Sequence, residues 1–124
     1  MSKVILIEDD RTMLSLLTIL LQIEGFEVCS FKDDFPESIL QALRQHQPDV
    51  ALLDVNLRQS SGLELVQVIR KDPELQHQRV IMSSGLNLSV ECLQAGANAF
   101  LLKPYMPEDL IRLIRENIGN QNSG

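Results

Sequence analysis

Three short apolar segments of this sequence are each followed by charged residues that could bind a cation or transfer a group. They are Val4–Ile7, Val50–Leu53 and Phe100–Leu102. The first runs into Glu8–Asp10, the second into Asp54 and the third into Lys103. If these segments are parallel strands of one sheet, their carboxyl ends meet at the edge where such sheets bind ligands. Like charges gathered at one edge are costly unless a cation joins them, so the pattern predicts a divalent metal beside Asp54.

The composition limits the classes of protein to which the chain can belong. Its 124 residues suffice for one domain with a single sizeable core. The formal charge of −6, without a cluster of Lys or Arg, predicts no direct binding to nucleic acid. Cys29 and Cys92 lack metal-ligand spacing and are typical of a reduced, cytoplasmic protein. The run Leu16–Leu21 is too short to cross a bilayer, so no membrane association is expected.

Apolar segments alternate with segments of helical periodicity along the whole chain. Strands are predicted at residues 3–7, 26–31, 50–54, 80–83 and 99–102, and helices at 11–24, 36–47, 62–71, 88–93 and 107–118. Because the strands are almost entirely apolar, both faces of the sheet should be covered. The pattern predicts a single α/β domain with five parallel strands and helices on both faces. We expect this domain to span residues 1–119 and a polar tail, 120–124, to be disordered.

The charged strand ends together resemble the receiver domain of two-component response regulators. The matching residues, in chain order, are Glu8, Asp9, Asp54, Ser84, Lys103 and Pro104. Gly62, eight residues after the aspartate, and Ala95–Ala97, before the lysine strand, add to the resemblance, which covers residues 3 to 118. It implies a flavodoxin-like (βα)5 fold with strand order 2-1-3-4-5. It also implies a cis peptide bond between Lys103 and Pro104, although most bonds before proline are trans.

The resemblance implies a phosphoacceptor site with Mg²⁺ as cofactor. Asp54 would accept a phosphoryl group from a phosphohistidine and form an acyl phosphate. Asp9 would ligate Mg²⁺ directly and Glu8 through water or a hydrogen bond. A carboxylate oxygen of Asp54 and the backbone carbonyl of Asn56 would complete the protein ligands. Hard oxygen ligands of this kind suit Mg²⁺.

Further roles follow from the same resemblance. Lys103 would pair with a phosphoryl oxygen, and Ser84 would donate its hydroxyl to the phosphoryl group. Movement of Ser84 would couple to Phe100, so these two residues would form a switch. Ser83 competes with Ser84 for the hydroxyl role, although Gly85 directly after the strand favours Ser84. Phe100 could equally be a core residue.

The implied partners are a histidine kinase or histidine phosphotransfer protein and an unidentified effector protein, and the chain could dimerise. In the first helix, Leu14, Leu17 and Leu21 share one stripe and should face the sheet. A second stripe, displaced around the helix and ending at Leu20, could widen this buried face. By resemblance, its outer part would instead be a surface for kinase docking. The expected docking residues are Asp10, Thr12, Met13 and Leu16.

Two other functions stay open at this point. One is a pseudo-receiver, an interaction scaffold that works without phosphorylation, and the intact acid, serine and lysine set argues against it. The other is an aspartate-nucleophile phosphatase of the haloacid dehalogenase kind. Such an enzyme places a second aspartate two residues after the nucleophile, where this chain has Asn56. The chain is therefore expected not to be an enzyme beyond promoting its own phosphorylation and dephosphorylation.

The sequence also departs from the receiver pattern in three places. Arg58 stands where receivers often have proline, four residues after Asp54. The segment Lys32–Pro36 looks about two residues longer than usual. The stretch from Ser84 to Lys103 looks about three residues shorter, which is nearly one helical turn. Because the fourth helix belongs to the output face of receivers, the output surface and dimer mode are left open.

Overall fold

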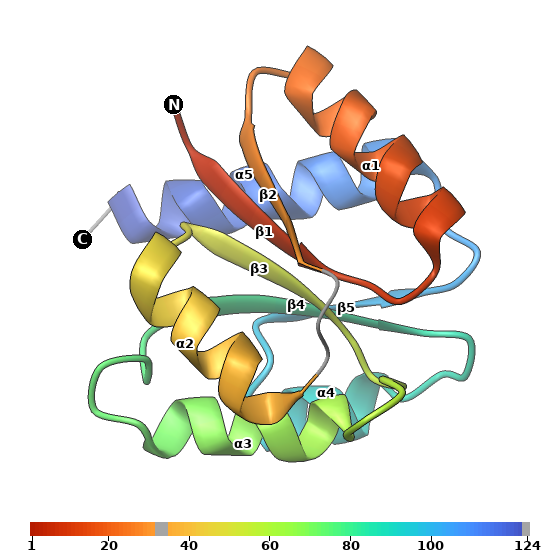
Figure 1. Ribbon diagram of the computed structural model, residues 1–124. Coiled ribbons are helices and arrows are strands. Elements are labelled where there is room, and N and C mark those ends of the chain that lie inside the picture. Colours follow the sequence, from red (N-terminus) through yellow and green to blue (C-terminus); the bar gives the residue numbers. More distant parts are fainter. Residues whose placement is uncertain (32–34, 123–124) are drawn as a thin grey trace.

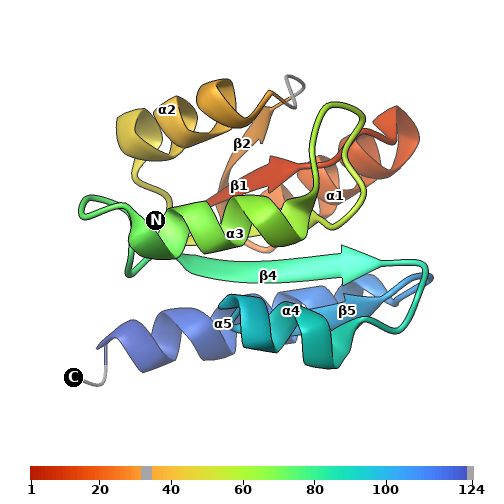
Figure 2. The same cartoon turned by 90° about the horizontal axis from the view of Figure 1, so that it is seen from below.

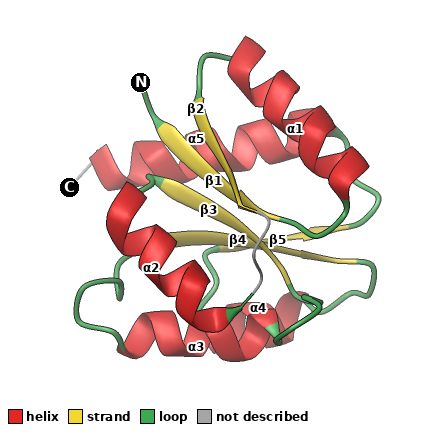
Figure 3. Cartoon of the chain, in the orientation of Figure 1, coloured by secondary structure: helices red, strands yellow, loops and turns green. Residues whose placement is uncertain are grey.

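The computed structural model describes residues 1–31 and 35–122, and side chains as far as residue 119. A five-stranded parallel sheet is covered by helices on both faces (Figures 1 and 3). The strands are β1 (Lys3–Ile7), β2 (Glu27–Phe31), β3 (Val50–Asp54), β4 (Arg79–Ser84) and β5 (Ala99–Leu102). The helices are α1 (Arg11–Ile23), α2 (Pro36–His46), α3 (Gly62–Lys71), α4 (Ser89–Ala95) and α5 (Pro107–Asn122). The strand order β2-β1-β3-β4-β5 confirms the predicted flavodoxin-like topology.

Two apolar cores lie on the two faces of the sheet, because alternate residues of each strand point to opposite faces. In β1, Ile5 and Ile7 belong to the core under α2, α3 and α4, whereas Val4 and Leu6 belong to the core under α1 and α5. Seen from below, α3 and α4 lie on the near side of the sheet and α1 and α5 on the far side (Figure 2). The predicted inner stripe of α1 is confirmed, since its three leucines are buried. They are Leu14, Leu17 and Leu21.

The ends of the elements follow the local chemistry of the chain. Asp10 caps α1, because its Oδ1 accepts a hydrogen bond from the Met13 N–H at 3.1 Å. Gly25, at φ +96°, reverses the chain after α1 in a conformation that suits glycine. The prediction that β2 begins at Phe26 is wrong by one residue, because the Phe26 N–H bonds to the carbonyl of Leu21 at the end of α1.

The last two helices differ from prediction. Helix α4 is short, with seven residues, but it runs over Ser89–Ala95 rather than 88–93. Arg70 fixes its end: Nε donates to the Gly96 carbonyl at 2.8 Å and an NH2 group donates to Asn98 Oδ1 at 2.9 Å. Helix α5 extends to Asn122 rather than ending at residue 118, since each residue added to an existing helix adds a backbone hydrogen bond. The expected turn at residues 32–36 lies mostly outside the described residues.

Gly62, the first residue of α3, is the glycine that most clearly requires its lack of a side chain. A Cβ atom there would lie 2.5 Å from the Asp54 carbonyl oxygen and 2.9 Å from the Val55 Cα. Both are backbone atoms, so they can move only if the end of β3 moves. The start of α3 therefore packs directly against the end of β3.

Replacing Gly62 with alanine should therefore destabilise the fold by roughly 1–3 kcal/mol, the usual cost of overpacking. Gly119, in α5, is the matched control, because a Cβ there meets nothing within 4 Å. Gly119→Ala should be neutral or stabilising by up to about 1 kcal/mol, since alanine favours a helix. Urea unfolding measures both variants. Equal unfolding midpoints for the two would contradict the close-approach explanation.

Candidate functional site

The register of the sheet brings the charged strand ends to one edge. Ile7 pairs with Leu53, and Ser84 pairs with Leu102. The residues that directly follow these pairs therefore lie along the same edge. Glu8, Asp54 and Lys103 each come two residues after a leucine of the core under α1 and α5, so their side chains continue on that face of the sheet. The three leucines are Leu6, Leu52 and Leu101.

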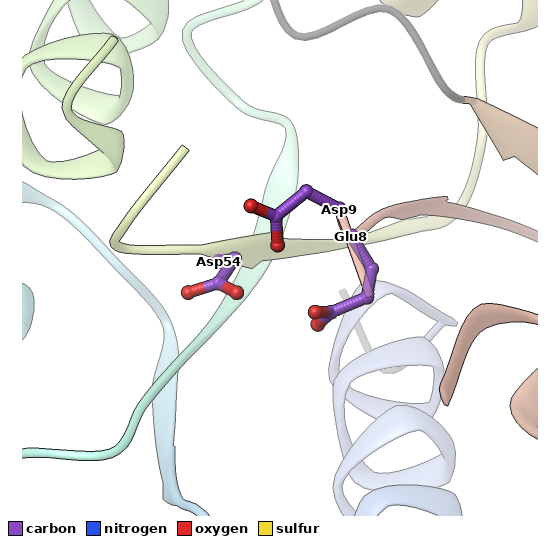
Figure 4. A group of neighbouring side chains, drawn as sticks. All are labelled: Glu8, Asp9 and Asp54. Atoms are coloured by element: carbon purple, nitrogen blue, oxygen red, sulfur yellow. The ribbon is translucent and has the colours of Figure 1, made fainter. Parts of the chain in front are cut away.

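Three carboxylates converge at this edge (Figure 4). Glu8, Asp9 and Asp54 each offer an oxygen, and these oxygens all lie within 4.8 Å of one another. Glu8 and Asp54 are buried, with 3% and 5% of their surface exposed, while Asp9 is half-buried. Burial together with the charge of Asp54 raises the pKa of Glu8, against the opposing effect of Lys103. The edge therefore gathers carboxyl groups in a place that is largely shielded from solvent.

Lys103 supplies a positive charge to this cluster. Its Nζ donates to Glu8 Oε1 and Oε2 at 3.2 and 3.1 Å and to Asp54 Oδ2 at 2.9 Å. Burial alone would lower the pKa of Lys103, but the hydrogen bond to Asp54 and the charges of Asp54 and Glu8 outweigh it, so the pKa is raised. The peptide bond between Lys103 and Pro104 is cis, as predicted. The predicted acid and lysine residues are thus brought together.

The loop after β3 positions Asp54 and brings a second cation to the site. The Asn56 N–H donates to Asp54 Oδ1 at 3.0 Å, and Asn56 forms an isolated antiparallel β-bridge with Ser61. Arg58, between them, places its Nε 3.9 Å from Asp9 Oδ2. The sequence prediction did not assign Arg58 to the site. The available signal was its unusual position four residues after Asp54.

The two candidate serines lie on opposite faces of β4. Ser83 pairs with Asp54 in the register and is fully buried. Ser84 is also buried, and its Oγ accepts a hydrogen bond from the Leu86 N–H at 3.1 Å. Met82, two residues before Ser84, pairs with Phe100, so Ser84 and Phe100 share the face that α4 covers. The structure therefore puts the two predicted switch residues on one face, and Phe100 packs against the core there.

The predicted docking residues lie on the outer side of the α1 N-terminus. Asp10, Thr12 and Leu16 are exposed, Leu16 by 49%, and Met13 is half-buried. Two exposed isoleucines that were not predicted, Ile19 and Ile23, extend this apolar stripe along α1. Their spacing from Leu16, three and seven residues, is the signal that could have found them.

This arrangement of acids, lysine and strand ends matches a known family. The family model for the response regulator receiver domain matches residues 4–115. The chain belongs to this family. Receiver domains are signalling modules of two-component systems that interact with histidine kinases and downstream effectors, and phosphorylation and Mg²⁺ binding are typical of them.

Individual relatives agree with this placement. The chain is 28% identical, over 119 residues, to the DNA-binding response regulator MtrA of Mycolicibacterium paratuberculosis. The match covers 94% of this chain and 51% of MtrA, so the chain spans about half the length of this relative. It also superimposes on a CheY-like response regulator receiver domain of Methanospirillum hungatei with a TM-score of 0.86 and 28% identity, covering 99% of this chain and 98% of that one.

A third similar structure bears on the metal. The receiver domain of the sensor histidine kinase PA1611 from Pseudomonas aeruginosa, described with a magnesium ion coordinated in its active-site cleft, has a TM-score of 0.83 and 25% identity. The match covers 95% of this chain and 98% of that one. In the present chain the donor set fits the same ion, because three carboxylates converge and supply hard oxygen ligands.

Within the described residues, no helix is long and apolar enough to cross a membrane.

Mg²⁺ should therefore raise the melting temperature of the protein. Mg²⁺ at 100 times its dissociation constant should stabilise the fold by about 2.7 kcal/mol. For a domain of this size, that corresponds to a shift on the order of 10 °C. Asp9→Asn should reduce the shift strongly, because it removes a half-buried carboxylate of the cluster. Differential scanning calorimetry with and without Mg²⁺ measures both.

Glu91→Gln is the control for this measurement, since it removes an exposed carboxylate on α4 that is not part of the cluster. This variant should respond to Mg²⁺ like the wild type. A wild-type melting curve that millimolar Mg²⁺ leaves unchanged would contradict the assignment of the metal site.

Proposed function

We propose that this chain accepts a phosphoryl group onto Asp54, with Mg²⁺ bound, from a histidine kinase or a histidine phosphotransfer protein. Phosphorylation would then change its interactions with a downstream effector protein. The observation that carries the proposal is the buried Asp54 carboxylate, held 2.9 Å from the Lys103 ammonium and beside two further carboxylates. Phosphoryl transfer depends mainly on positioning and charge neutralisation, which are the properties of this cluster.

Asp54 would act as the nucleophile. One of its carboxylate oxygens attacks the phosphorus of the phosphohistidine, so that an O–P bond forms while the P–N bond breaks. The histidine leaves with the electron pair of that bond, and the product is an acyl phosphate. The hydrogen bond from the Asn56 N–H to Oδ1 orients the carboxylate for this attack. Water later attacks the same phosphorus, which releases inorganic phosphate and restores the carboxylate.

The neighbouring groups would neutralise the charge of the phosphoryl oxygens. Lys103 already donates to Asp54 Oδ2 and would pair with a phosphoryl oxygen. Glu8, Asp9, Asp54 and the Asn56 carbonyl would hold Mg²⁺, which supplies further charge neutralisation when it is bound. The carboxylates would bind Mg²⁺, and the Lys103 ammonium would pair with the transferred phosphoryl group.

Ser84 and Phe100 would carry the change away from the site. The Ser84 hydroxyl would turn from its Leu86 contact to donate to the phosphoryl group. Since Phe100 shares the face of the sheet with Ser84, its side chain can respond to that movement. Phosphorylation would thus shift an equilibrium between two existing states.

The partners and location of the chain stay predictions. The net charge of −6 favours a protein effector over direct contact with nucleic acid, although the relative MtrA is named as DNA-binding. Dimerisation of the chain and a cytoplasmic location are likewise expected and untested. A phosphorylation-independent scaffold is the alternative that the next experiment separates from our proposal.

Acetyl phosphate with Mg²⁺ should phosphorylate the wild-type protein and retard it on a Phos-tag gel. Asp54→Asn should abolish the shift, because an amide is a far weaker nucleophile than a carboxylate. Asp109→Asn, a half-exposed aspartate on α5, is the control and should label like the wild type. An unshifted, folded wild-type protein would favour the scaffold function instead.

Leu16→Glu should abolish phosphotransfer from the cognate histidine-containing partner while labelling by acetyl phosphate stays intact. The reason is that Leu16 is 49% exposed on α1 and would contribute to docking rather than chemistry. Leu17→Glu is the contrasting variant, since Leu17 is 1% exposed and its change should disrupt the core and both activities. If Leu16→Glu also loses labelling by acetyl phosphate, the docking role of this surface is wrong.

A further inference from the structure

Arg58 belongs to the loop between β3 and α3, and the base of this loop is closely held. The Gly62 N–H donates to the Val55 carbonyl at 2.7 Å, and Asn56 forms a β-bridge with Ser61. Because β3 ends at Asp54, these contacts set the position of the loop relative to the acid cluster. Arg58 therefore starts from a defined backbone position beside the carboxylates.

The two cations at this edge contact different carboxylates. Lys103 donates to Glu8 and to Asp54, whereas Arg58 Nε lies 3.9 Å from Asp9 Oδ2. The two side chains also differ in solvent exposure, since Lys103 is 24% exposed and Arg58 is 74% exposed. Lys103 is thus part of the buried cluster, while Arg58 approaches the outermost acid from the solvent side.

We propose that Arg58 is a built-in counter-cation of Asp9 that competes with Mg²⁺ for this carboxylate and thereby sets the metal affinity of the site. The inference rests on the proposed function in that Mg²⁺ is taken as the ligand. Direct ligation by Asp9 would place Mg²⁺ about 2.1 Å from a carboxylate oxygen, which brings a second cation close to the guanidinium. The two cations repel each other, so metal binding costs free energy unless the guanidinium moves away.

The chemistry of arginine suits this role. A guanidinium stays charged at every physiological pH, so the competition is always present. An exposed ion pair is weak, so it reduces the metal affinity without blocking the site. From the strength of such pairs, the reduction should be roughly 1.5-fold to fivefold. Because the side chain is mostly in solvent, it can leave Asp9 without disturbing the core.

Calorimetric titration of the metal-free protein with MgCl₂ tests the inference. Arg58→Gln should tighten Mg²⁺ binding roughly 1.5-fold to fivefold in low salt, and the difference should shrink in about 0.5 M KCl because exposed charges are screened. Arg112→Gln is the matched control, since it removes the same charge from a surface ion pair of α5. It should leave the dissociation constant close to that of the wild type.

The outcomes separate this inference from the proposed function. If the wild type binds Mg²⁺ and Arg58→Gln binds no tighter than Arg112→Gln, the role of Arg58 is wrong and the metal site stands. Weaker binding by Arg58→Gln would also overturn it, because Arg58 would then assist the metal. If neither the wild type nor Arg58→Gln binds Mg²⁺, both the competition and the metal part of the proposed function fail.

A double-mutant cycle in metal-free buffer tests the contact itself. Arg58→Gln should lower the melting temperature more when Asp9 is present than in the Asp9→Asn background. This readout needs neither metal nor phosphoryl donor. An equal effect of Arg58→Gln in both backgrounds would overturn the pairing of Arg58 with Asp9.

Discussion

The structure of this site depends on one interaction, the contact of the Lys103 ammonium with two buried carboxylates. Glu8 and Asp54 are almost fully buried and carry like charges, an arrangement that is strongly unfavourable without a cation. Lys103 lies about 3 Å from both and makes their burial possible. Removing one partner of such a buried pair costs roughly 3–5 kcal/mol, because the remaining charge has no partner. The same contact orients the Asp54 carboxylate, as its proposed role as a nucleophile requires.

The topology of the sheet explains why a lysine fills this position. In the order β2-β1-β3-β4-β5, strand β4 separates the lysine at the end of β5 from Asp54 at the end of β3. Neighbouring strands lie about 4.8 Å apart, so the side chain must reach past one whole strand. A long, flexible ammonium side chain can do so, and Ser83, on the same face of β4, is small enough to leave room for it. The site thus follows from the strand order together with side chains of suitable length.

Much of the fold and the centre of the site could be predicted from sequence because they depend on periodic patterns. The apolar strands, the helical stripe of Leu14, Leu17 and Leu21, and the charged strand ends all follow local rules, and the parallel register brings the charges together. The contacts of long side chains from loops and helices do not follow such rules. Arg58 pairs with Asp9, and Arg70 donates a hydrogen bond to the Gly96 carbonyl at the end of α4, only because the tertiary fold brings those groups close together.

Chemical mapping of the phosphorylated residue tests whether Asp54 is the phosphoacceptor. Borohydride reduces an aspartyl phosphate to homoserine, so the protein is treated with acetyl phosphate and Mg²⁺, reduced, digested and sequenced by mass spectrometry. We predict homoserine at position 54, and none there when Mg²⁺ is chelated or when Lys103 is replaced by methionine. Reduction of a glutamyl phosphate at Glu8 would not give homoserine. Homoserine at Asp9, or no conversion of Asp54 in the folded protein, would show that Asp54 is not the phosphoacceptor.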